Sequence, residues 1–286
     1  MTTVPSRVAN RLVANVKRFQ PILSSAKARD VNESDTVIII TDMLSEIFGY
    51  EKYSDITSEH AIRGTFCDLA LLLDGRIQIL LEAKAIGIEL KDSHVKQAVD
   101  YAANKGVDWV VLTNGTHWRI YRVLFAKPID QDLVYEIDFL SVDTRKTEEL
   151  ELLFVLTKEA WGKQALNDLH QQRQVLSKFV IAAVTTTETV LEVIRRELRR
   201  ICPDVKLQTE QIEQVLVREV LKREVVEGEK ADEARKKVSR CCNRQLRSRA
   251  EKTAGEITPA IPLQALPVVT GSAAMDGPQP AQPAAE

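Results

Sequence analysis

Apolar positions in the first fifty residues recur every three or four residues, as on the buried face of a helix. This spacing predicts an amphipathic helix over residues 5–28 that ends near Pro21, with its apolar face formed by Val8, Leu12, Val13, Val16 and Phe19. A second helix is expected to begin at a cap of Asn32 or Ser34 and to stop at Gly49. Its apolar face comprises Val37, Ile40, Met43, Leu44 and Ile47.

Strand-like apolar runs replace this spacing from Tyr53 to Ala85. Breaks at Gly64 and at Asp74-Gly75 divide them into a predicted meander of three strands. A helix over residues 92–105 follows and ends at Gly106. Strands are predicted over 107–113 and 116–123, with a further strand over 133–140. This order predicts one α/β unit with a mixed sheet flanked by helices, over residues 1–144.

Helical spacing alone continues after Thr144, with predicted helices over 147–160, 164–183, 186–200 and 209–226. The region 145–252 ends in a basic stretch, whose members are Arg235, Lys236, Lys237, Arg240, Arg244, Arg247, Arg249 and Lys252. This stretch either binds nucleic-acid phosphates without sequence preference or is the solvated end of a helix. Residues 253–286 are rich in Pro and Ala and almost without charge, so we expect a disordered tail.

Composition narrows the class of protein. The chain has 286 residues, 44% of them hydrophobic, and a formal net charge of −2, which argues against a uniformly basic coat for nucleic acid. It contains no apolar run long enough to span a membrane and no signal-peptide core, so we expect a cytoplasmic protein. The four cysteines lack CxxC spacing, which predicts reduced thiols without structural zinc.

Three charged residues interrupt the apolar runs of the predicted meander. Asp68 precedes one run, and Glu82 and Lys84 end the next. Because buried charge is costly unless it is paired or bound to a metal, these residues are candidates for a site. The alternative is an edge strand with alternating charges and an ion pair across to Asp68.

The hairpin connection decides whether Asp68 and Glu82 share a face of the sheet. A two-residue turn at Asp74-Gly75 would pair Asp68 with Leu81 and place the two carboxylates on opposite faces. A three-residue loop with Gly75 in the left-handed conformation would instead pair Asp68 with Leu80 and place them on one face. We therefore expect the odd-length loop, or an equivalent bulge nearer Asp68.

Two carboxylates beside a backbone carbonyl are ligands that Mg²⁺ prefers. Such an ion activates water and neutralises charge on a phosphate, while Lys84 would orient the water or stabilise the phosphoryl oxygens. The chemistry expected of this arrangement is phosphodiester hydrolysis.

The sequence resembles the PD-(D/E)xK nucleases, and in particular the amino-terminal nuclease domain of type I restriction enzyme restriction subunits. The resemblance covers residues 30–125 and rests on Asp68, on Glu82-Ala83-Lys84, on Gln97 and Tyr101 of a QxxxY pattern, and on the strand ending in Thr113-Asn114-Gly115. It implies a restriction-endonuclease-like fold and a catalytic site of Asp68, Glu82, Lys84, Gln97 and Tyr101. Asp68 and Glu82 would hold the metal.

Members of this family often add an acidic residue from the first helix of the fold. Glu33 is the preferred match as a third metal ligand, and Glu46 is the second choice. A glutamate near a helix start is, however, stabilised by the helix dipole whatever its function.

The chain departs from the resembled subunits because it carries no GxxxxGK[ST] motif and hence no ATP-driven motor. It is expected either to act alone on DNA or to depend on other restriction-system subunits; a homodimer is also left open. The leading hypothesis is a Mg²⁺-dependent DNA endonuclease in restriction or DNA processing. The alternative is a nuclease-fold protein that binds nucleic acid or a protein partner without cutting.

Overall fold

A six-stranded mixed sheet forms the centre of the first part of the chain. The computed structural model describes residues 3–58 and 67–255, with side chains as far as residue 242. The strands are β1 (Ile56–Ser58), β2 (Leu69–Leu73), β3 (Arg76–Ala83), β4 (Trp109–Thr113), β5 (His117–Leu124) and β6 (Asp130–Asp138), and they lie side by side in chain order. Among the described strands only the β3–β4 pair is parallel, and α3 (Asp92–Lys105) forms its crossover. The predicted mixed sheet flanked by helices is confirmed.

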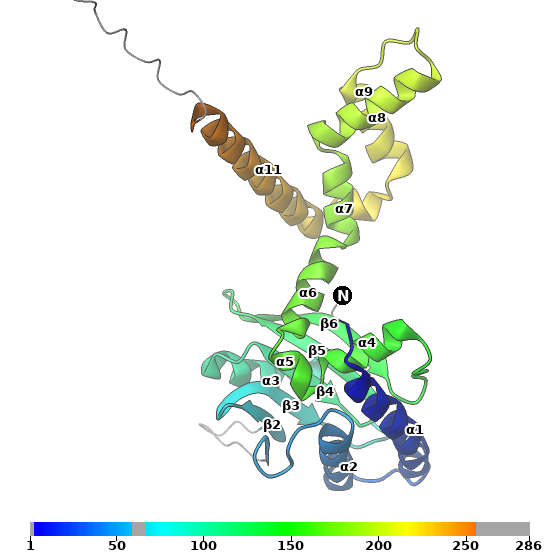
Figure 1. Cartoon of the computed structure of the whole chain (residues 1–286), viewed down its shortest axis with the longest axis vertical. Coiled ribbons are helices and arrows are strands. Elements are labelled where there is room, and N and C mark those ends of the chain that lie inside the picture. Colours follow the sequence, from blue (N-terminus) through cyan, green and yellow to red (C-terminus); the bar gives the residue numbers. More distant parts are fainter. Residues whose placement is uncertain (1–2, 59–66, 256–286) are drawn as a thin grey trace, which may run out of the picture.

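Helices cover both faces of this sheet (Figure 1). One core joins β-strand side chains such as Ile79 and Val111 to α1 (Ser6–Ala28), α2 (Glu33–Glu46) and α4 (Thr147–Val155). The other core joins Leu80 and Leu112 to the buried face of α3. Because successive side chains of a strand point to opposite faces, the buried run Ile79, Leu80 and Leu81 makes β3 apolar toward both layers immediately before Glu82.

The first helix does not end near Pro21 as expected. It continues through this proline to Ala28. Proline lacks the amide that would bond to the preceding turn, but Leu23 and Ala26 beyond it are fully buried, and packing of these side chains keeps the last turns helical.

The region after residue 144 is helical as predicted but more finely divided. It contains, besides α4, α5 (Lys158–Trp161), α6 (Ala165–Val175), α7 (Lys178–Thr185), α8 (Glu188–Ile201), α9 (Thr209–Val215), a π-helix (Leu216–Val220), α10 (Arg223–Val226) and α11 (Glu229–Gly255). Polar residues stand at the unexpected breaks: Thr157 donates to the carbonyl of Phe154, and Ser177 accepts from the amide of Val180. Such local bonds compete with continuation of a helix.

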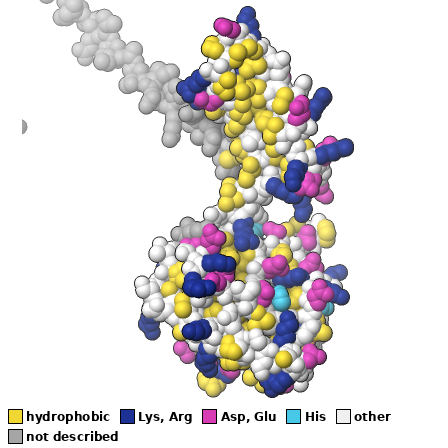
Figure 2. Space-filling model, turned by 90° about the vertical axis from the view of Figure 1, so that its right-hand side faces the viewer, with side chains coloured by type: hydrophobic (Ala, Val, Ile, Leu, Met, Phe, Trp, Pro, Cys, Tyr) yellow, Lys and Arg dark blue, Asp and Glu magenta, His cyan; other side chains and the backbone are white. Residues whose placement is uncertain are grey.

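Figure 1 shows α6 leading from the sheet into a projecting group of helices, in which α11 leans away from α8 and α9. Hydrophobic side chains form a band along this projection (Figure 2), and the exposed ones include Leu176, Ile181, Val193 and Val215. The predicted tail begins inside α11, which extends to Gly255; its residues 256–286 lie outside the described residues, as does the predicted break at Gly64. Over the described part of the chain, no helix has the length and apolar character needed to cross a membrane.

Candidate active site

The hairpin between β2 and β3 brings Asp68 beside Glu82, although not by the loop expected first. The turn has two residues, Asp74 and Gly75, both with positive φ (50° and 72°), so the expected three-residue loop is wrong. The register instead shifts between Leu71 and Leu72, where Gln78 is the extra residue of a bulge in β3. The alternative expectation of a bulge is confirmed, and the last ladder pair becomes Leu69 with Leu81.

This register determines the position of Asp68. It stands one residue before β2, opposite Glu82 and on the same face of the sheet. Its Oδ2 accepts a hydrogen bond from the backbone N–H of Ala83 at 2.7 Å. The carboxylate therefore accepts the hydrogen bond that a strand carbonyl would accept if the ladder continued. This bond holds the carboxylate beside Ala83, the residue between Glu82 and Lys84.

The ammonium of Lys84 lies among oxygens from two elements. Its Nζ is 2.7 Å from Glu82 Oε1, 2.7 Å from the carbonyl oxygen of Ala83 and 3.6 Å from Glu33 Oε2. The side chains of Glu82 and Lys84 are mostly buried, at 11% and 20% exposure, whereas that of Glu33 is half-exposed. Glu82 and Glu33 thus lie within ion-pair distance of the ammonium, and the charge of Asp68 also acts on it. The formal charges of these four residues sum to −2.

Burial and this excess of negative charge shift the pKa values at the site. Burial is the main cause that raises the pKa of Glu82, and the Asp68 carboxylate adds to it against the opposing effect of Lys84. Burial alone would lower the pKa of Lys84, but the neighbouring carboxylates outweigh it and raise that pKa. The buried thiol of Cys67 has its pKa raised to about 12 by burial and by Glu82 and Asp68. All three shifts have the sign that an electronegative, partly dehydrated site produces.

Glu33 reaches the site because the start of α2 is tied to the segment after β3. Asn32 caps the helix by accepting from the amide of Asp35 at 2.9 Å. One turn later, the buried hydroxyl of Thr36 accepts from the amide of Ile86 at 3.1 Å. Glu46, the second choice from this helix, lies at its other end and pairs with Arg18, away from Lys84.

Residues at the end of β4 also hydrogen-bond to the segment that follows β3. The amide of Lys84 donates to the carbonyl of Thr113 at 2.9 Å. Asn114 donates to the carbonyls of Ile86 and Ile88, while its Oδ1 accepts from the amide of Thr116. The Thr-Asn-Gly sequence therefore positions the site. Sequence reasoning noticed this motif but missed the positioning role of Asn114 and Thr36, because nothing in the spacing showed which loop they would hold.

The QxxxY residues lie on α3, with Gln97 exposed and Tyr101 buried. Tyr101 packs with Cys67 and Leu80, and its hydroxyl has no hydrogen-bond partner in the described part of the chain. The hydroxyl of Tyr101 therefore does not bond to Lys84, whose ammonium is bound by Glu82 and by the carbonyl of Ala83.

The donors at the site fit a hard divalent cation in kind, since they are carboxylate oxygens and a carbonyl oxygen. They are not yet arranged as a cluster: among the described residues, no group of three or more His, Cys, Asp or Glu side chains is placed to hold a metal ion. Glu82 and Glu33 instead pair with Lys84, while Asp68 accepts from the amide of Ala83. A metal would have to draw them together.

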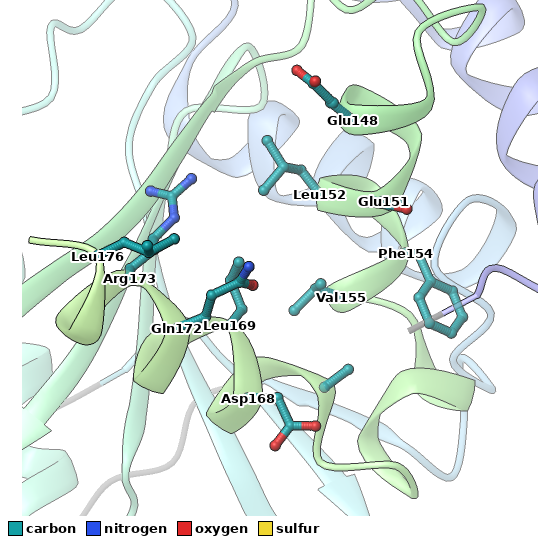
Figure 3. Close-up of a pocket in the computed structure, with 11 residues that line it drawn as sticks. Glu148, Glu151, Leu152, Phe154, Val155, Asp168, Leu169, Gln172, Arg173 and Leu176 are labelled. Atoms are coloured by element: carbon teal, nitrogen blue, oxygen red, sulfur yellow. The ribbon is translucent and has the colours of Figure 1, made fainter. Parts of the chain in front are cut away.

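A separate cavity of about 530 Å³ lies between α4 and α6 (Figure 3). Leu152 and Val155 of α4 face Leu169 of α6 across it, with Glu148 and Asp168 also in its lining. None of the predicted site residues lines this cavity, so it does not belong to the group around Lys84.

A family model matches part of the chain. No curated protein and no solved structure matches the chain. Residues 39–130, about a third of the chain, match the family model of the type I restriction enzyme R protein N terminus. This segment contains Asp68, Glu82, Lys84, Gln97 and Tyr101. The resemblance seen in the motifs is therefore confirmed for residues 39–130, which match the N-terminal family of type I restriction enzyme R proteins.

Proposed function

We propose that this chain is a Mg²⁺-dependent DNA endonuclease of the restriction type, acting on phosphodiester bonds in the cytoplasm. The match of residues 39–130 to the R-protein N terminus supports a restriction-type nuclease role. The observation that carries the proposal is local: Asp68, Glu82 and Lys84 meet on one face at the end of β3, within that matched segment.

Asp68 and Glu82 would hold the metal together with the carbonyl of Ala83, and Glu33 would act as an outer ligand. A bound Mg²⁺ would lower the pKa of a water molecule and neutralise charge on the scissile phosphate. Lys84 would place its ammonium on the phosphoryl oxygens, where a point charge stabilises the pentacoordinate state. Gln97, exposed on α3, would contact a phosphate, whereas buried Tyr101 would support the site from the core.

DNA and other restriction-system subunits are the partners that this proposal implies. Part of the basic stretch has a described position on α11. Arg235 pairs with Asp232, and Lys237 donates to Gln174. Lys236 and Arg240 form no ion pair with any described side chain, which leaves their charges available for phosphates.

A plasmid-nicking assay tests the proposal. The purified chain should nick supercoiled DNA with Mg²⁺ and not with EDTA. Lys84→Ala should reduce the rate by at least about 100-fold, the effect typical of losing one transition-state contact. Lys52→Ala is the control, because Lys52 forms a 2.8 Å pair with Asp42 on an exposed surface outside the site. Equal nicking by the wild type and Lys84→Ala would favour the alternative, a nuclease-fold protein that binds without cutting.

A further inference from the structure

The side chain of Lys84 takes up the oxygens that a metal would need. Its ammonium contacts Glu82 Oε1 and the Ala83 carbonyl at hydrogen-bond distance, with Glu33 Oε2 slightly farther away. These are the same two carboxylates and one carbonyl that the proposed function assigns to the metal and its surroundings. The ammonium and a divalent cation would compete for them.

Asp68 is held independently of this contact. Its Oδ2 is bound by the backbone N–H of Ala83, so its position depends on the hairpin register and not on Lys84. One ligand of the site is therefore fixed in advance, while the other two are engaged by a lysine, whose four-carbon stem is flexible. The lysine can leave without disturbing the fixed ligand.

The ammonium of Lys84 also supplies the counter-charge that the buried carboxylate of Glu82 requires. Glu82 is almost fully buried at the end of an apolar strand, and a buried carboxylate without a counter-charge is strongly unfavourable. The ammonium of Lys84 satisfies this carboxylate through a charge-assisted hydrogen bond.

We propose that Lys84 is the resident counter-cation of the metal-free site, and that a divalent cation must displace its ammonium from Glu82 and the Ala83 carbonyl before the amine can meet a DNA phosphate. This inference rests on the proposed function and adds an order of events to it: metal binding releases the lysine. The same residue therefore weakens metal binding in the free protein and contacts the substrate in the loaded one.

Metal affinity tests this displacement directly. Binding of Mg²⁺ and of Mn²⁺ to the full chain is measured by isothermal titration calorimetry and by Mn²⁺ electron paramagnetic resonance. Lys84→Met should tighten binding about tenfold, because the competitor bound through a charged hydrogen bond is removed. Lys52→Met removes an exposed lysine from a carboxylate and should leave the affinity unchanged. Unchanged or weaker binding in Lys84→Met overturns the inference.

A second measurement avoids any folding defect of the variant. Acylation of lysines in the wild-type chain by an N-hydroxysuccinimide ester is followed by peptide mass spectrometry. Adding Mg²⁺ at constant ionic strength should raise the acylation rate of Lys84 several-fold and leave that of Lys52 unchanged. A Lys84 rate that does not respond to saturating Mg²⁺ overturns the displacement.

The nicking assay separates this inference from the proposed function. If the wild type cuts DNA with Mg²⁺ but Lys84→Met binds metal no tighter, the displacement is wrong and the nuclease proposal stands. If neither protein binds Mg²⁺ or Mn²⁺ and the wild type does not cut, both are wrong. Glu82→Gln should bind metal poorly, and undiminished affinity in that variant would place the metal elsewhere and overturn the inference.

Discussion

The carboxylate of Asp68 accepts a hydrogen bond from the backbone N–H of Ala83, the residue between Glu82 and Lys84. At 2.7 Å this bond takes the place of a ladder hydrogen bond one residue before the start of β2. It joins the register of the β2–β3 hairpin to the position of a candidate metal ligand. The site geometry is therefore a direct consequence of strand pairing.

Charge and hydrogen bonding at Asp68 can be separated by two substitutions. Asp68→Asn keeps an oxygen that can accept from Ala83 and should leave the free energy of unfolding within about 1 kcal/mol of wild type. Asp68→Ala leaves that amide without its partner and should cost about 1–3 kcal/mol. Both should lose Mg²⁺-dependent nicking, because both lack the negative charge. Urea unfolding and the plasmid assay measure the two effects, and an active Asp68→Asn would exclude this carboxylate as a metal ligand.

Thr36 is expected to hold α2 against the segment that follows Lys84. Its hydroxyl is buried and accepts from the amide of Ile86, so Thr36→Val should destabilise the fold by about 1–3 kcal/mol. Thr41→Val is a matched control on the same helix, because its hydroxyl donates to the carbonyl of Val37 within that helix. It should cost less than about 0.5 kcal/mol. Similar urea midpoints for the two variants would show that the bond to Ile86 contributes little.

Gly115 and Gly75 have similar left-handed backbones but different surroundings. Their φ angles are +81° and +72°, and a Cβ on Gly115 would lie 3.4 Å from Leu23 Cδ2, whereas one on Gly75 would meet open space. Gly75→Ala should cost about 1–2 kcal/mol from the backbone alone. Gly115→Ala should cost more, since the turn also packs against α1. Thermal unfolding compares them, and an equal loss in both would mean that Leu23 moves aside freely.

The pair of Asp55 with Lys158 predicts a pH-dependent contribution to stability. Burial would raise the pKa of Asp55, but Lys158 and the amide of Glu51 outweigh it and lower that pKa. Because the pKa of Asp55 is lower in the folded state, its ionised carboxylate stabilises the fold at pH values above the unfolded-state pKa of 3.8. This stabilisation is lost as the pH falls through the folded-state pKa. Asp55→Asn should therefore cost about 1–2 kcal/mol at pH 7, a modest figure because Lys158 is partly exposed.

This cost should persist down to about pH 4 and vanish only below it. Urea unfolding of wild type and Asp55→Asn between pH 7 and pH 2.5 measures the difference. A difference that fades already between pH 7 and pH 5 would contradict the lowered pKa of Asp55.

Lys236 and Arg240 on α11 should contribute to binding of DNA without sequence preference. Replacing both by alanine should weaken binding and reduce the slope of log K against log salt by up to about two, one unit for each lost phosphate contact. Arg223→Ala is the control, because this arginine is already paired with Glu227. Fluorescence anisotropy at several salt concentrations gives the slopes, and an unchanged slope in the double variant would assign the basic stretch to a solvated helix end.

Sequence patterns determined most of the elements of the α/β part, because its helices and strands have apolar spacings that match their own periods. The predicted helix boundaries were wrong where a local hydrogen bond or packing decided them. The first helix continues past Pro21 because its last turns are packed, and a new helix begins after Ser177, which caps it. The Glu-x-Lys pattern and the QxxxY helix also indicated the resemblance that the family match over residues 39–130 bears out.

Only the tertiary structure decided how the site is assembled. The sequence placed a turn at Asp74-Gly75 but not its length, and it did not place the bulge at Gln78, the one residue that decides which face of the sheet Asp68 occupies. The approach of Glu33 to Lys84 depends on Thr36 bonding to Ile86, fifty residues away. Local periodicity fixes which side chains are buried, but long-range hydrogen bonds fix which charges meet, and these bonds leave no spacing in the sequence.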